Sequence, residues 1–170
     1  MQLVLSESAR VTTAEESRFR IADPNSRPRV SCIIALDGES LAALKALKDH
    51  PWNGARFFRY VEVRPTSLPN VHIDAVIEDI EGDRKSLSEE ITRADMVVMV
   101  TTAGSAPHAA EIIGNACFVR GKRATGLVLV AGESGKGLTK TLTAMRPYAA
   151  MLVVSTGEDY IAEMLSALRA

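Results

Sequence analysis

Four short stretches of the sequence combine glycine, serine and threonine, and each follows an apolar run and precedes a helical pattern. They are residues 37–40, 101–108, 131–137 and 155–159. A turn of this composition presents backbone N–H groups beside the positive end of a helix, which is an arrangement that binds phosphate or carboxylate groups. The same residues are also common helix caps, which every α/β protein needs. Anion binding and ordinary capping are therefore both open interpretations of these turns.

The candidate ligand-binding residues are glycines and polar side chains of the first three turns. They are Asp37, Gly38, Ser40, Thr101, Thr102, Gly104, Ser105, Glu133, Ser134 and Gly135. The third turn invites comparison with the phosphate-binding P-loop of nucleotide hydrolases, because Glu-Ser-Gly-Lys follows an apolar run and opens a helix. However, Val130 stands where the P-loop has its first glycine, and Gly137 replaces the Ser or Thr that would hold magnesium. A generic anion-binding turn with Lys136 fits this pattern better than a true P-loop does.

His108 and Lys136 are the two candidate catalytic residues. His108 is expected three residues into a helix that begins at Ser105, where an imidazole could serve as a base or an electrophile. The alternative is an exposed histidine in a capping region with no chemical role. Glu111 is placed to pair with His108 on the solvent face, and no Ser/His/Asp arrangement is visible. The acidic residues between 74 and 83 match no calcium loop, so the sequence predicts a solvated sheet edge there and no metal site.

These turns need a sheet to position them, and two continuous apolar runs predict its centre. Residues 96–100 and 127–130 have the composition of strands covered on both faces. The helix predicted between them has an inward stripe, a capping serine, a proline in its first turn and a glycine just past its end. These are Ala109, Ile112, Ile113, Ala116 and Val119, with Ser105, Pro107 and Gly121. A right-handed crossover places the turn 101–108 at the carboxyl edge of the sheet, where open α/β sheets bind ligands.

The remaining elements predict an α/β fold. Strands are expected at 30–36 and 56–63, a half-exposed strand near an edge at 71–80, and a further strand at 149–154. Ser86 to Glu89 form a capping-box pattern that opens a short helix, and later helices are expected at 135–146 and 157–169. The predicted architecture is a three-layer, doubly wound, Rossmann-like sheet of about five or six mainly parallel strands. Residues 1–29 are expected to form an N-terminal arm or edge strand, and residues 30–170 a single domain.

The composition of the chain limits the kinds of partner and the cellular compartment that we expect for this protein. The chain has 170 residues, of which 46% are hydrophobic and 24% charged, and a formal net charge of −1. Lysine and arginine are scattered, so no nucleic-acid partner is expected. No apolar stretch is long enough to span a bilayer and no secretory signal is present, which predicts a cytoplasmic protein without a membrane partner. Cys32 and Cys117 fall inside predicted elements and are expected to be buried thiols.

The segment 90–104, which reads EITRADMVVMVTTAG, resembles the segment "EALxGADMVFxTAGMGGG" of the FtsZ/tubulin family of GTPases. The following helices and strands keep the order of that family, so the resemblance covers about residues 86–160. It implies a related nucleotide-binding core. This sequence departs from the family pattern at two segments of the phosphate site. Residues 105–108 read SAPH where the family has its glycine-rich signature, and the family's glycine-rich first turn is reduced here to residues 37–40. The chain also ends before the family's central helix and catalytic loop, so the resemblance implies neither GTP hydrolysis nor filament formation.

Three functional hypotheses follow from these patterns. The first is a small cytoplasmic module that binds a nucleotide or phosphorylated small molecule at the carboxyl ends of its strands, without efficient hydrolysis. The second is a structural or assembly protein of the same fold that has lost its ligand and acts as a homo-oligomer or with a partner chain. The third is an enzyme that uses His108 or Lys136. A nucleotide is the one cofactor that the pattern suggests.

Overall fold

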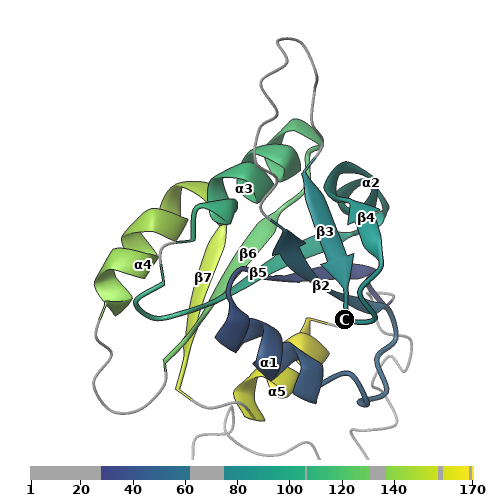
Figure 1. Cartoon of the computed structure of the whole chain (residues 1–170), viewed down its shortest axis with the longest axis horizontal. Coiled ribbons are helices and arrows are strands. Elements are labelled where there is room, and N and C mark those ends of the chain that lie inside the picture. Colours follow the sequence, from purple (N-terminus) through teal and green to yellow (C-terminus); the bar gives the residue numbers. More distant parts are fainter. Residues whose placement is uncertain (1–27, 62–74, 106, 131–136, 157–158, 169) are drawn as a thin grey trace, which may run out of the picture.

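The computed structural model describes residues 28–61, 75–105, 107–130, 137–156, 159–168 and 170. Their strands form one seven-stranded sheet with the order β4-β3-β2-β1-β5-β6-β7 (Figure 1). The strands are β1 (Ser31–Ala35), β2 (Ala55–Val61), β3 (Val76–Asp79), β4 (Arg84–Ser86), β5 (Met96–Thr102), β6 (Ala124–Leu129) and β7 (Met151–Ser155). The neighbours β2, β1, β5, β6 and β7 are parallel, whereas β3 and β4 run antiparallel to their neighbours. The chain is therefore an α/β protein with a mostly parallel sheet.

Helices cover both faces of this sheet. They are α1 (Gly38–Ala46), α2 (Leu87–Arg93), α3 (Ala109–Val119), α4 (Leu138–Met145) and α5 (Asp159–Ala167), with a short 3-10 turn, η3 (Arg146–Tyr148). One buried cluster joins alternate side chains of β1 and β5, such as Ile34 and Met99, to α2, α3 and α4. A second cluster joins the intervening side chains, such as Ile33 and Val98, to α1 and α5, which lie on the other side of the sheet in Figure 1. Burial on both faces explains why these strands read as continuous apolar runs.

The sheet has seven strands where the sequence predicted about five or six, because β4, which was not predicted, pairs antiparallel with the predicted strand β3. Strand β4 has only three residues, Arg-Lys-Ser, and so offers no apolar alternation that could have predicted it. It becomes the edge strand and leaves β3 second from the edge. Ile77 is fully buried while the other residues of β3 are half-buried. Residues 71–74 of the predicted strand lie outside the described residues.

Helix α3 forms where it was predicted but is turned about its axis. Ala109 and Ile113 are buried as expected, whereas Ile112 is 45% exposed and Val119 is 79% exposed. The buried face is instead made mainly of small residues, including Gly114. A Cβ added to Gly114 would lie 2.5 Å from the Cβ of Tyr148, so the helix packs directly on η3 through this glycine. Close backbone approach, and not side-chain size, decides which face points inward.

The start of α3 also differs from the prediction. The N-cap residue is His108, which makes no side-chain capping hydrogen bond, so Ser105 is not the cap. Pro107 precedes the helix, and His108 stands immediately before it where the sequence predicted a position three residues inside. At the other end, Gly121 has a φ of +64° just beyond the helix, as the sequence predicted.

Several local predictions are confirmed. Ser86 caps α2, because its hydroxyl accepts a hydrogen bond of 3.2 Å from the N–H of Glu89. Cys32 and Cys117 are both buried, at 2% and 1% exposure. Burial raises the pKa of the Cys117 thiol to about 11 and that of Cys32 further in the same direction, which keeps both thiols protonated near neutral pH. In the part of the chain that the structure describes, no helix is long and apolar enough to cross a membrane.

Candidate functional site

Asp37 lies at the carboxyl end of β1 and caps helix α1. Its Oδ1 atom accepts a hydrogen bond of 2.8 Å from the N–H of Ser40, and its own N–H donates to the Ser40 hydroxyl at 3.2 Å. This reciprocal capping box uses the positive end of α1 to hold a carboxylate of the protein itself. An external anion would have to displace Asp37 to bind at the same helix end.

The second oxygen of Asp37 binds the neighbouring turn. Its Oδ2 atom accepts hydrogen bonds from the hydroxyl of Thr101 at 2.9 Å and from the N–H of Thr102 at 2.8 Å. Strands β1 and β5 are parallel neighbours, and the N–H of Leu36 continues their ladder by donating to Val100 O at 2.9 Å. The structure therefore brings together the predicted turns 37–40 and 101–108, which lie about sixty residues apart in the sequence.

A third element, helix α4, joins the same edge through Thr141. Its buried hydroxyl accepts a hydrogen bond of 3.0 Å from the N–H of Gly104 and donates one of 2.9 Å to the carbonyl of Ser105. Gly137, at the start of α4, has a φ of +80°, and an added Cβ would lie 2.5 Å from the Cα of Gly104. Only glycine permits both the conformation and this approach. Sequence reasoning missed Thr141 because a threonine inside a helical pattern carries no signal for this contact.

A groove of about 300 Å³ opens beside these contacts, between α3 and α4. Its lining consists of Ser105, Pro107, His108, Glu111, Lys140, Ala144 and Tyr148. The helices that flank it have His108 and Gly137 as their N-cap residues, and neither residue supplies a side-chain hydrogen bond to its helix. The groove thus combines an exposed lysine from the first turn of α4, a histidine and the start of α3, a set of groups that suits an anionic ligand with an apolar body.

The structure places only part of the predicted site. Gly38 begins α1, and an added Cβ there would meet no atom within 4 Å. Glu133, Ser134, Gly135 and Lys136 lie outside the described residues, so the P-loop-like turn stays a prediction. His108 and Glu111 do line one groove. In the fourth predicted turn, Ser155 is buried at the end of β7, and its carbonyl accepts a hydrogen bond of 2.8 Å from the N–H of Val130.

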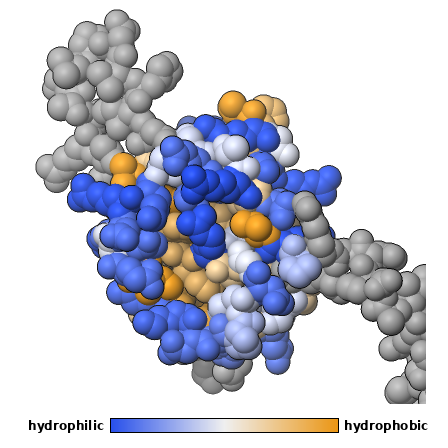
Figure 2. Space-filling view, turned by 90° about the vertical axis from the view of Figure 1, so that its right-hand side faces the viewer, coloured by the Kyte–Doolittle hydropathy of each residue, from blue (hydrophilic) through white to orange (hydrophobic). Residues whose placement is uncertain are grey.

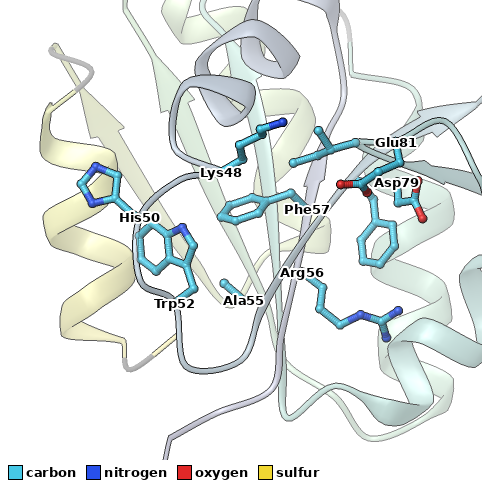
Figure 3. A pocket seen from close by; sticks show the side chains of 10 residues that line it. Lys48, His50, Trp52, Ala55, Arg56, Phe57, Asp79 and Glu81 are labelled. Atoms are coloured by element: carbon cyan, nitrogen blue, oxygen red, sulfur yellow. The ribbon is translucent and has the colours of Figure 1, made fainter.

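A second cavity, of about 440 Å³, lies at the opposite end of the parallel strands and was not predicted (Figure 3). It is lined by residues from the end of α1, the start of β2 and the turn after β3, which are distant in the sequence. Trp52 forms one wall: its indole N–H donates to Leu47 O at 2.8 Å, and its ring meets Phe57 edge-on at 5.8 Å between centroids. Arg56 and Asp79 also line the cavity but pair with Glu90 and Lys85. The one signal for this site was the single tryptophan of the chain, in a polar stretch.

Comparison with known proteins adds no functional assignment. No protein-family model matches the chain, and no curated protein matches it.

Proposed function

We propose that this chain is a doubly wound, three-layer Rossmann-like module that binds a nucleotide or phosphorylated small molecule at the carboxyl ends of its strands, without efficient hydrolysis. The observation that carries the proposal is the junction of the two turns that follow β1 and β5. The strand order reverses between these strands, since β2 lies on one side of β1 and β5 on the other. Open α/β sheets bind ligands in the crevice at such a reversal.

The hydrogen bonds of Asp37 locate the anionic group of the ligand more narrowly. Asp37 already fills the start of α1 and would repel a phosphate there. We therefore assign Asp37, Ser40, Thr101 and Thr102 a positioning role, in which they hold the turn that presents Gly104 and Ser105. The phosphate is then expected at the groove between α3 and α4, close to Lys140, with the rest of the ligand along Ala144 and Tyr148.

The resemblance of residues 86–160 to the FtsZ/tubulin family supports a nucleotide as the first ligand class to test. The most similar stretch ends at Gly104, which borders the groove through Ser105. Because the glycine-rich signature is replaced by SAPH, the backbone can grip a phosphate less completely than in that family, which is why hydrolysis is not part of the proposal.

A thermal-shift screen tests the proposal with GTP, GDP, ATP, NAD and sugar phosphates, each with and without magnesium. A ligand at a hundred times its dissociation constant stabilises the fold by about 2.7 kcal/mol, which is several degrees for a chain of this size. We expect Lys140→Ala to lose the shift and Lys45→Ala, an exposed lysine on α1, to keep it. Trp52 lies in the opposite cavity, so a ligand in the groove should leave its emission unchanged. The absence of a shift across the panel would contradict the proposal.

An assembly role is the second candidate function, and the inward-facing Asp37 is the observation that favours it. A carboxylate held by three protein hydrogen bonds at the start of α1, a helix end that could otherwise bind an anion, is also what a core that has lost its ligand would contain. A tight stoichiometric small-molecule complex would contradict this role, whereas a stable homo-oligomer would support it. An enzyme using His108 or Lys136 is the third candidate, and it requires that His108→Ala or Lys136→Ala folds normally and loses turnover.

A further inference from the structure

The two outer strands of the sheet differ in charge. Strand β4 contains Arg84 and Lys85, and Lys85 pairs with Asp79 of β3 at 3.8 Å. The side of the molecule that carries β4 and α2 shows many hydrophilic residues around a central apolar area (Figure 2). Strand β7 contains no charged residue, and neither do its flanks, since residues 147–156 read PYAAMLVVST. Within the described ranges, β6 is the single strand neighbour of β7.

An outer strand has backbone N–H and C=O groups that can pair with another strand, and charged side chains normally prevent this. Strand β4 has that protection and is short. Strand β7 lacks it, and its Met151 and Val154 side chains are 44% and 41% exposed. These two residues are three positions apart and therefore lie on opposite faces of the sheet. A strand added beside β7 would find an apolar contact on each face.

We propose that β7 pairs antiparallel with β7 of a second copy of this chain, so that one sheet runs through both copies. A two-fold axis pairs residue i of one copy with residue j of the other, and residue j of the first with residue i of the second. The two positive residues of a short outer strand such as β4 would therefore lie against positive residues of the other copy, whereas β7 brings no charge. Pairing of β7 with β4 is the less favourable choice, because it would place the uncharged strand against Arg84 and Lys85. Self-pairing of β7 also gives a closed dimer, since both copies use the same surface.

This dimer specifies the surface of the homo-oligomer considered above and does not require the ligand groove. Sedimentation velocity of the full chain without ligand tests it over a wide range of concentration, separately from the ligand screen. We expect a dimer that dissociates on dilution. Val154→Lys should raise its dissociation constant about tenfold or more, because each copy then brings a positive charge into the short pair of strands. The matched control is Ile112→Lys on α3, whose native side chain is 45% exposed, and it should leave the dissociation constant unchanged.

Several outcomes would overturn the proposal: a monomer at every concentration, filaments that lengthen with concentration, or a dimer that Ile112→Lys weakens and Val154→Lys does not. If circular dichroism shows that Val154→Lys is misfolded, hydrogen exchange of the wild-type chain decides. Slower exchange of β7 amides at high concentration supports self-pairing, and exchange that is independent of concentration contradicts it.

Discussion

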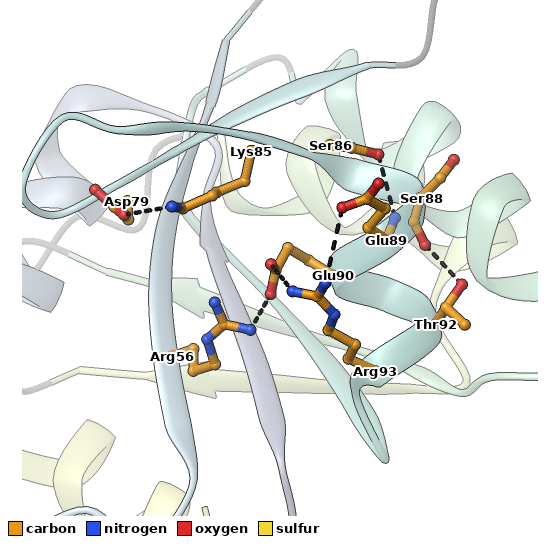
Figure 4. Close-up of polar contacts among 9 residues, drawn as sticks. All are labelled: Arg56, Asp79, Lys85, Ser86, Ser88, Glu89, Glu90, Thr92 and Arg93. Atoms are coloured by element: carbon orange, nitrogen blue, oxygen red, sulfur yellow. Dashed lines mark hydrogen bonds and ion pairs between the residues drawn. The ribbon is translucent and has the colours of Figure 1, made fainter.

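On one side of β1, ion pairs link β2 to α2, β2 to β3 and β3 to β4 in addition to the sheet hydrogen bonds, whereas on the other side α3 and β6 pack closely on their neighbours at glycines. The carboxylate of Glu90 is only 2% exposed and pairs with Arg56 and with Arg93, the latter at 3.4 Å (Figure 4). Arg59 pairs with Glu78 in the same half. These charged side chains are therefore paired with one another within the chain.

The other half depends on glycines that let neighbouring elements approach closely. Gly114 of α3 lies against the backbone of Tyr148, and Gly126 of β6 leaves room for the Leu152 side chain of β7. Packing of this kind fixes β7 on its inner side but does nothing for its outer side. The ion-paired half therefore carries charges that also protect its outer strand, whereas in the packed half β7 brings no charge to its outer side and has, among the described residues, no strand there.

The largest expected effect comes from breaking the buried ion pair. Arg56→Met leaves Glu90 buried with Arg93 as its main partner, and it also removes the contact of Arg56 with the Phe58 ring at 5.4 Å. We expect a loss of about 3 kcal/mol in the free energy of unfolding, since a buried carboxylate that loses one of its two ion-pair partners is costly. Urea denaturation followed by circular dichroism measures this loss.

The control is Arg59→Met, because the Arg59 side chain is 50% exposed and its pair should contribute less than about 1 kcal/mol. The double variant Arg56→Met with Glu90→Leu should recover much of the stability, because it removes both charges. Equal losses for Arg56→Met and Arg59→Met would show that burial of Glu90 does not distinguish the two pairs.

A smaller effect is expected from crowding the packed half. In Gly114→Ala the new methyl group would lie 2.5 Å from Tyr148 Cβ and 2.9 Å from its carbonyl oxygen, so α3 or η3 must move. We expect a loss of about 2 kcal/mol, which is within the range for overpacking. Thermal denaturation measures it, and Gly38→Ala, which meets no atom within 4 Å, serves as the control.

Gly126→Ala sharpens this test, because the atoms nearest to its added Cβ are the ends of the Leu152 and Met145 side chains. These side chains can rotate away, so the cost should be lower than for Gly114→Ala. The reverse order would mean that β7 is held against β6 more tightly than η3 is held against α3.

The smallest effect on stability is expected from removing the two positive charges of the outer strand β4. Arg84→Thr with Lys85→Val should change the free energy of unfolding by less than about 1 kcal/mol, because Arg84 is exposed and Lys85 makes only the long pair with Asp79. Association should nevertheless increase, since β4 then resembles β7. Light scattering against concentration measures the change, and the charge-conserving variant Arg84→Lys with Lys85→Arg should behave as the wild type.

The central strands of the fold could be predicted from the sequence, whereas the charged outer strand β4 could not. Apolar runs identify β5 and β6 because both faces of these strands are buried, and Ser86 identifies the start of α2 because capping is a local interaction. Strand β4 escapes prediction because three polar residues become a strand only when β3 is beside them. The orientation of α3 escapes prediction because it depends on contact between Gly114 and Tyr148, which are distant in the sequence.

The candidate site, too, could be predicted from the sequence only in part. The turns that follow β1 and β5 are recognisable from glycine, serine and threonine after apolar runs, and the structure joins them. The inward direction of Asp37 and the role of Thr141 depend on partners about sixty and about forty residues away, respectively. Composition therefore predicts where the turns lie, while only the tertiary structure shows that Asp37 faces Thr101 and that Thr141 supports Gly104.

The central position of β1 has a consequence for synthesis of the chain. Its neighbour β2 follows after a short connection, but β5, on its other side, emerges from the ribosome only after β2, β3, β4 and α2. Closing a loop of this length costs about 4 kcal/mol of chain entropy. Until β5 arrives, the most apolar strand of the nascent protein has one unpaired side and is exposed to chaperones and to neighbouring chains. When β5 pairs with β1, this exposure ends. The hydrogen bonds from Thr101 and Thr102 to Asp37 form in the same step.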